Sequence, residues 1–106
     1  MDSPRRPKAI NIPPMQAELQ ALRAQIDDVD QRLLKLLTER LKLVLQVGDL
    51  KRQHGAVVRD DQREREMLER LPKLAEAPLT PESVHRIYTL LINEARTLEE
   101  AHVYRK

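Results

Sequence analysis

Apolar residues recur in alternating steps of three and four along the first half of the chain. The stripe consists of Leu19, Leu22, Ile26, Val29, Leu33, Leu36, Leu43, Val47 and Leu50, with Leu37 and Val44 beside it. This spacing predicts one amphipathic helix with a heptad-like apolar face. Pro14 can begin this helix and Gly55 can end it, which predicts about 40 residues and a length of about 60 Å at 1.5 Å per residue.

A helix of this length cannot bury its apolar stripe within so small a chain. A folded monomer of about 100 residues has a radius of gyration of only about 13 Å. The rest of the chain offers two short helices to cover the stripe. The pattern therefore predicts an intertwined homodimer.

A short helix is predicted after a loop over residues 55–60. Asp60 or Asp61 can cap its first turn, and Asp61 with Glu64 fits a capping box. Its apolar residues are Met67, Leu68, Leu71 and Leu74. Pro72 lies inside this pattern and should end or kink the helix near Leu71.

A third helix is predicted to begin with Thr80 as its N-cap and Pro81 at its first position. Its stripe consists of Val84, Ile87, Tyr88, Leu91, Ile92, Ala95 and Leu98. Only 2% of the 106 residues are aromatic and two are glycine, so the chain has little material typical of β-sheets. The sequence predicts an all-α fold with three helices, the first of them long.

The first 14 residues contain four prolines and are expected to form a disordered lead, followed by a single domain over residues 15–106. No apolar segment follows the basic residues of this lead, so it does not resemble a secretory signal. No run approaches the roughly 18 apolar residues of a membrane helix. A cytoplasmic protein is expected.

The charge is nearly balanced, with 19 basic and 17 acidic residues interspersed along the chain. Nucleic-acid binders more often gather basic residues on one face, together with aromatic side chains, so no nucleic-acid partner is expected. The chain has no cysteine, which excludes disulfides and thiolate metal sites. His54, His85 and His102 show no metal-ligand spacing and are expected to be surface or structural residues.

Several charged residues interrupt or extend the apolar faces. Arg40 occupies a position of the first stripe, and Lys51 lies three turns further along the same side. Arg23 lies beside the stripe, and Glu99 continues the face of the third helix. A guanidinium that is buried without a partner is costly, so Arg40 needs an anion nearby.

Each of these residues also has an ordinary structural explanation. Arg23 could be solvated or paired with Asp27, and Arg40 could pair with a glutamate across a dimer. Lys51 could favour the helix C-terminus. The remaining three, Arg63, Glu64 and Glu99, could simply lie at the surface.

Taken together, the same residues describe a pocket for a small dianion, with fixed cations, an acidic hydrogen-bonding group and apolar walls. The sequence shows no nucleophilic triad, no glycine-rich phosphate loop and no metal cluster. Chemistry in such a pocket would depend on positioning and electrostatics, without a cofactor or metal.

Four segments resemble the all-helical chorismate mutases. They are Leu22–Asp30, Leu33–Arg40, Val47–Lys51 and Val58–Glu64, and the resemblance extends from about Leu19 to Glu100. It implies an intertwined dimer that rearranges chorismate to prephenate in phenylalanine and tyrosine biosynthesis. The combined spacing of Arg23, Arg40, Lys51, Asp60, Arg63 and Glu64 makes it specific.

The resemblance also implies roles for individual residues. Arg40 and the partner's Arg23 should bind the two carboxylates of the substrate, where guanidinium forks hold it in its reactive shape. Lys51 should contact a carboxylate and the ether oxygen. Glu64 should accept a hydrogen bond from the ring hydroxyl, helped by the backbone near Asp60. Arg63 should be a supporting charge that orders the site. Apolar wall should come from Val47 and Ile92.

Two positions depart from the pattern common in bacterial members. Glu99 stands where a glutamine usually lies beside the ether oxygen, and a carboxylate donates a hydrogen bond only when it is protonated. Burial would raise its pKa above the free value of about 4.3, whereas Lys51 would lower it. Ala95 replaces a serine that often assists a substrate carboxylate, and this change should weaken substrate affinity.

Other functions fit parts of the same pattern. A 4-amino-4-deoxychorismate mutase shares this scaffold and differs in the ring substituent that faces Glu64. Isochorismate pyruvate lyases also share it, but residues 60–64 fit the mutase pattern better. A non-catalytic helical dimerisation module would explain the heptads but not the position of Arg40. A mutase that depends on a partner enzyme is a further alternative.

Overall fold

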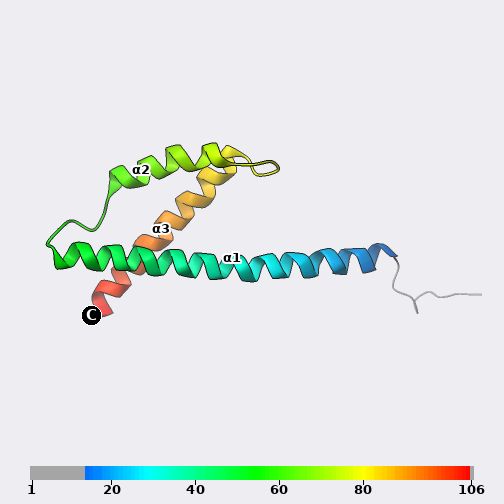
Figure 1. The fold of residues 1–106 in the computed structure, drawn as a ribbon, viewed down its shortest axis with the longest axis horizontal. Helices are drawn as coiled ribbons and strands as arrows, with labels where there is room; N and C mark the ends of the chain where they lie inside the picture. The colour runs from blue at the N-terminus through cyan, green and yellow to red at the C-terminus, as the bar shows by residue number, and fades with distance from the viewer. Residues whose placement is uncertain (1–13, 106) are drawn as a thin grey trace, which may run out of the picture. The chain divides into compact units, whose positions relative to one another are not determined.

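The computed structural model describes residues 14–105, and these residues form only helices and their connections. The elements are α1 (Pro14–Gln53), α2 (Asp61–Arg70), the short 3-10 helix η1 (Leu71–Leu74) and α3 (Pro81–Arg105). Figure 1 shows their order along the chain, from blue to red. The prediction of an all-α fold with a long first helix is confirmed. The predicted disordered lead lies outside the described residues, apart from Pro14.

The chain divides into two compact units, and the division falls within α1. The first unit ends at Glu39, and the second runs from Arg40 onward. The second unit contains the last part of α1 together with α2, η1 and α3. The prediction of a single domain over residues 15–106 stays a prediction.

In the first unit, the described residues belong to α1 and carry the predicted stripe on an exposed surface. Leu22 and Ile26 are each 57% exposed, and Leu36 is 61% exposed. Within the second unit the stripe residues Leu43, Val47 and Leu50 are also more than half exposed. The apolar face that the periodicity predicts is therefore uncovered in the single chain.

The end of α1 is fixed by Gly55, which adopts a positive φ of 69°. The backbone N–H of Gly55 donates to the Arg52 carbonyl at 3.1 Å, and that of Ala56 donates to the Lys51 carbonyl at 2.8 Å. This pair of hydrogen bonds is the Schellman arrangement, in which glycine tolerates the left-handed conformation without strain. The prediction that Gly55 ends the helix is confirmed.

The start of α2 is capped by Asp60, whose Oδ1 accepts a hydrogen bond from the Arg63 N–H at 2.9 Å. Asp61 is the first residue of the helix, so the predicted capping box between Asp61 and Glu64 was wrong. The Glu64 side chain instead reaches Arg96 on α3. The helix ends at Arg70, and Pro72 lies in the 3-10 turn that follows, as predicted.

Helix α3 begins as the sequence predicts. The Thr80 hydroxyl accepts from the Ser83 N–H at 3.0 Å, and Pro81 is the first helical residue. The small core of the described residues consists of Met67, Val84, Ile92 and Ala95, which are all less than 9% exposed. Three of these four lie on the predicted stripe of α3, whereas Ile87 and Leu98 of the same stripe are exposed. Among residues 14–105, no helix has the length and apolar character needed to cross a bilayer.

Candidate functional site

The second unit contains a cavity of about 790 Å³. Helix α1 contributes Arg40, Leu43, Val44, Val47, Lys51 and Arg52 to its lining. The segment between α1 and the middle of α2 contributes Val58, Arg59, Asp60, Arg63, Glu64 and Met67, and α3 contributes Ile92, Ala95, Arg96, Glu99 and Glu100. Its volume lies within the range of small-molecule sites.

Six of the lining residues are cationic and four are carboxylates, so the lining favours an anion. Arg40 and Lys51 lie on the same side of α1 and line the same cavity, because eleven residues correspond to about three helical turns. The guanidinium carbon of Arg40 lies 5.7 Å from the centroid of the Tyr88 ring. This distance permits a cation–π interaction that steadies the side chain without neutralising its charge.

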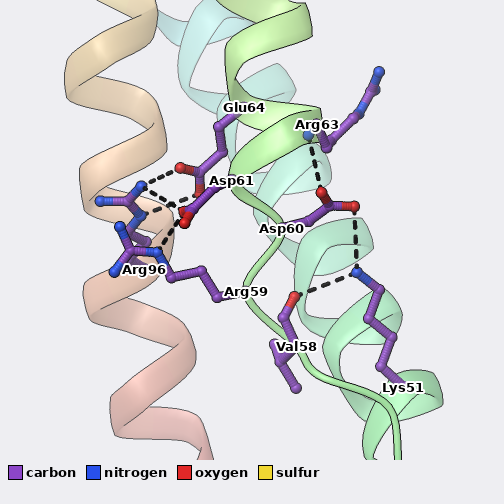
Figure 2. Close-up of polar contacts among 8 residues, drawn as sticks. All are labelled: Lys51, Val58, Arg59, Asp60, Asp61, Arg63, Glu64 and Arg96. Carbon is purple, nitrogen blue, oxygen red and sulfur yellow. Dashed lines mark hydrogen bonds and ion pairs between the residues drawn. The ribbon is translucent and has the colours of Figure 1, made fainter.

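Lys51 is held at the edge of the cavity by the loop before α2. Its Nζ donates to the Val58 carbonyl at 3.3 Å and lies 3.8 Å from the Asp60 carboxylate (Figure 2). Its side chain is 28% exposed. Asp60 therefore caps α2 and restrains Lys51 at the same time, and these two contacts fix the ammonium relative to the start of α2.

Arg63 lines the cavity through the first turn of α2, but its guanidinium is engaged elsewhere. It forms an ion pair with Glu66, one turn along α2. Figure 2 shows its side chain directed away from Asp60 and Glu64. In the single chain its backbone N–H, which donates to Asp60, is the group that orders this corner of the site.

Glu64 is held by Arg96 across the gap between α2 and α3. The Arg96 Nε donates to Glu64 Oε2 at 3.1 Å, and its Nη2 pairs with Oε1 (Figure 2). Arg96 Nη2 also lies 3.9 Å from Asp61, which in turn pairs with Arg59 at 2.7 Å. The hydrogen bond and charge of Glu64 raise the pKa of Arg96, and Arg59 lowers the pKa of Asp61.

Glu99 lies against the backbone of α1 at Gly48, the one buried residue of that helix. Burial is the largest influence on its carboxyl group and raises its pKa above the usual 4.5. The charges of Arg52 and Lys51 act in the opposite direction, and Glu64 adds to the rise. The effect of burial on the pKa of Glu99 outweighs the effect of the two cations, so the net shift is upward. The sequence alone left this direction open.

Less than one helical turn after Glu99, His102 is the last described side chain of α3, and it contacts α1. The His102 Nε2 lies 3.2 Å from Oδ1 of Asp49, and the same oxygen accepts from Arg52 Nη2 at 2.7 Å. The contact between His102 and Asp49 ties the end of α3 to the last turns of α1. His54 and His85 are exposed, in line with their predicted surface or structural character.

Nine of the ten residues singled out from the sequence line this cavity. They are Arg40, Val47, Lys51, Asp60, Arg63, Glu64, Ile92, Ala95 and Glu99. Arg23 lies in the first unit, is exposed and does not line the cavity. Within residues 14–105, no group of three His, Cys, Asp or Glu side chains is arranged to hold a metal ion.

Sequence reasoning missed three cations of the cavity, Arg52, Arg59 and Arg96. Arg96 follows Ile92 by one helical turn, and Arg52 follows Gly48 by one turn, so both share a face with residues that line or adjoin the cavity. This periodicity could have identified Arg52 and Arg96, whereas Arg59 lies between α1 and α2 and has no helical period. The predicted face of α3 instead followed the apolar positions from Ala95 to Leu98.

The family model of chorismate mutase type II matches residues 22–100, which is most of the chain. The chain belongs to this family. A chorismate mutase from Thermus thermophilus has a similar structure, with a TM-score of 0.74 and 34% identity over 78% of this chain and 94% of that one. The family resemblance inferred from the sequence is confirmed.

Curated relatives of this chorismate mutase family member include single-function and bifunctional proteins. The chorismate mutase of Methanocaldococcus jannaschii is 30% identical over 81% of this chain and 88% of that protein. The T-protein of Enterobacter agglomerans is 42% identical, and the bifunctional chorismate mutase/prephenate dehydratase of Escherichia coli is 39% identical. The chain spans less than a quarter of these two longer proteins.

Proposed function

We propose that this protein is a chorismate mutase that rearranges chorismate to prephenate without a cofactor, in the biosynthesis of phenylalanine and tyrosine. The observation that carries the proposal is the convergence of Arg40, Lys51, Glu64 and Glu99 on one cavity of suitable size. Membership of the chorismate mutase family supports it. The apolar residues Val47 and Ile92 line the same cavity and suit the carbon skeleton of a small dicarboxylate.

The reaction is an intramolecular Claisen rearrangement, in which a C–O bond breaks while a C–C bond forms. No protein group has to bond covalently to the substrate. The protein accelerates such a step by holding the substrate in its reactive shape and by stabilising charge that develops in the transition state. Fixed cations in a partly apolar cavity are suited to both tasks.

We assign the substrate carboxylates to Arg40 and to Arg23 of the partner subunit. Lys51 donates to one carboxylate and to the ether oxygen, on which negative charge grows as the C–O bond lengthens. The contacts of Lys51 with Val58 and Asp60 support this role, because they hold the ammonium in place before substrate binds. A preorganised donor costs no reorganisation during the reaction.

Two carboxyl groups complete the site in this proposal. Glu64 accepts from the ring hydroxyl, supported by the backbone near Asp60, while Arg63 orders the start of α2. Glu99, in its protonated form, donates to the ether oxygen. The raised pKa of Glu99 supports this assignment, because it increases the protonated fraction near neutral pH. Ala95 has no hydroxyl group, so the contact that a serine at this position would make with a substrate carboxylate is missing.

We also propose that two chains form an intertwined homodimer. The support is the uncovered apolar face of α1, on which Leu22, Ile26 and Leu36 are each more than half exposed. Contiguous apolar surface of this extent is unusual on a monomeric protein. A second copy would cover the stripe of one chain with the same stripe of the other.

The proposal is tested by following the loss of chorismate absorbance with purified protein and by identifying the product by chromatography. Turnover to prephenate without added metal or cofactor is the expected result. The Arg40→Ala variant provides the blank, since its preparation contains the same contaminants. Equal rates for the wild type and this blank, or a product other than prephenate, would contradict the proposal.

A further inference from the structure

We propose that Arg96 is a specificity-determining residue that selects substrates with a neutral hydroxyl over substrates with an ammonium group at the ring carbon facing Glu64. This inference rests on the proposed function and deepens it. The inference concerns the choice between chorismate and its 4-amino-4-deoxy analogue, because the shared scaffold alone does not distinguish these two substrates. The basis is the arrangement of charges around Glu64.

Arg96 engages both oxygens of Glu64 in a fork. Its Nε lies 3.1 Å from Oε2, and its Nη2 pairs with Oε1. The Glu64 side chain is only 20% exposed and that of Arg96 is 34% exposed, so water screens this pair incompletely. A two-point contact of this kind fixes the plane and direction of the carboxylate as well as its charge.

The pair still leaves Glu64 able to accept a hydrogen bond. An ionised carboxylate has about four acceptor sites, and a fork of two N–H groups occupies two of them. A ring hydroxyl can donate to a remaining site, and it brings no charge with it. The guanidinium has no acceptor, so it offers nothing to a donor on the substrate.

An ammonium group would meet a different balance. A primary aliphatic amine is largely protonated near pH 7. Its attraction to Glu64 would be offset by repulsion from Arg96, which is paired with the same carboxylate and lines the same cavity. The neighbouring Arg59 and Asp61 form their own pair at 2.7 Å. Together with Arg96 and Glu64 they make a cluster of two cations and two carboxylates, which has no net negative charge to attract a cation.

Arg96 also joins α2 to α3, so a purely structural role must be separated from specificity. A structural role predicts that its loss lowers the turnover of both substrates by the same factor. A role in specificity predicts that its loss changes their ratio, because removing the guanidinium frees the negative charge of Glu64 for an ammonium. The ratio of the two kcat/KM values is therefore the informative quantity.

The experiment measures kcat/KM for chorismate and for 4-amino-4-deoxychorismate with the wild type, Arg96→Met, Arg96→Gln, Arg96→Lys and Arg70→Met. Methionine keeps much of the side-chain volume without charge, and lysine keeps the charge. Arg70→Met is the matched control, since Arg70 pairs with Glu66 on α2 and does not line the cavity. Circular dichroism checks the folding of each variant.

We expect the wild type and Arg70→Met to prefer chorismate, and Arg96→Met to shift the ratio by about tenfold or more toward the amino substrate. Arg96→Lys should keep most of the preference. If Arg96→Met fails to fold, Arg96→Gln makes the same comparison. If neither uncharged variant folds, Arg96→Lys decides, and a loss of the preference in that variant overturns the inference.

Two further results overturn the inference. A ratio that is unchanged in the uncharged variants does so and leaves the proposed function standing. A wild type that prefers the amino substrate does so as well, and it favours a 4-amino-4-deoxychorismate mutase over the proposed function. A wild type that converts neither substrate overturns the proposed function as well.

Discussion

The carboxyl group of Glu99 occupies a space that exists because residue 48 is glycine. A Cβ atom added at Gly48 would lie 2.7 Å from Glu99 Oε2 and 3.4 Å from Arg52 Nη2. The first distance is closer than nonbonded atoms approach, whereas the second requires only a small shift. Any side chain at position 48 must therefore displace the carboxyl group that we assign to the ether oxygen.

The Gly48→Ala variant should separate stability from activity. Glycine inside a helix costs about 1 kcal/mol relative to alanine, and the atom that must move is the end of a flexible side chain. We expect the melting temperature to stay constant or rise, while kcat falls by about tenfold or more because Glu99 is misplaced. Thermal unfolding and steady-state kinetics measure the two effects.

A second substitution provides the control for this prediction. Adding Glu99→Asp to Gly48→Ala shortens the acid by one methylene and relieves the contact, so the double variant should lose less activity than the two single losses combined. Strictly additive losses, or a full kcat in Gly48→Ala, would show that the space at Gly48 does not position Glu99.

The activity should rise toward acidic pH. Burial raises the pKa of Glu99 above 4.5, so the protonated carboxyl that can donate to the ether oxygen becomes more populated as pH falls through that raised value. The kcat of the wild type measured between pH 5 and 8 tests this expectation. Glu99→Gln donates at every pH and should give a flat profile, whereas a flat wild-type profile would argue against the role of Glu99.

The same shift affects stability with a defined sign. Because the pKa of Glu99 is higher in the folded state, its contribution to the free energy of unfolding is greatest below pH 4.5 and is lost as pH rises through the raised pKa. Glu99→Gln should remove this dependence. Urea unfolding of both proteins at several pH values gives the slope of the free energy of unfolding against pH. Identical slopes for the wild type and Glu99→Gln would show that burial does not penalise the charged form of Glu99.

Arg40→Ala and Lys51→Ala should each abolish most turnover and leave the fold intact. Both side chains are partly exposed and line the cavity, and neither belongs to the buried core. We expect kcat/KM to fall by a factor of about 10² to 10³ or more, as when a preorganised donor is removed. Lys42→Ala, an exposed cation on the same helix, is the control and should retain activity. Wild-type rates in either cavity variant would remove that residue from the mechanism.

Mixing two inactive variants tests the assignment of Arg23. If each site combines Arg40 of one chain with the partner's Arg23, then a heterodimer of Arg23→Ala and Arg40→Ala chains has one intact site. Random exchange after joint refolding should recover about a quarter of wild-type activity, because half of the dimers are mixed and each has one working site of two. No recovery above the sum of the separate variants would contradict a shared site.

Two helix caps should differ in their effect on catalysis. Thr80 caps α3 outside the cavity, and Asp60 caps α2 while it also contacts Lys51. Replacing either with alanine should lower the free energy of unfolding by about 1 kcal/mol. Only Asp60→Ala should also lower kcat/KM beyond the change in folded fraction, and equal activities of the two variants would show that Asp60 does not restrain Lys51 functionally.

Local signals in the sequence were sufficient for the helices and for much of the cavity. Gly55, Pro72 and the Thr80–Pro81 pair act on the backbone within a turn or two, so their effects follow from residue type alone. The spacing of Arg40 and Lys51 on one helix likewise required no tertiary information. These predictions depended on helix geometry, which is the same in every protein.

Contacts between helices were harder to anticipate. From the sequence, Glu64 could have formed a hydrogen bond at its own helix terminus or an ion pair with a cation on α3. Its observed partner is Arg96, and this contact depends on how α2 packs against α3. The direction of the Glu99 pKa depended on weighing burial against two nearby cations, which needs the three-dimensional arrangement. The close approach at Gly48 involves residues 51 positions apart and leaves no periodic signal.

The contact between His102 and Asp49 gives the last turns of α3 an anchor on α1. Glu99 lies less than one helical turn before His102, in a region where an unanchored helix end would fray. In the mechanism that we propose, the position of the acid thus depends on His102, a residue that touches no substrate. A related chain that changed position 102 would keep every group assigned to the substrate and still lose the alignment of its acid, unless another contact held the helix end.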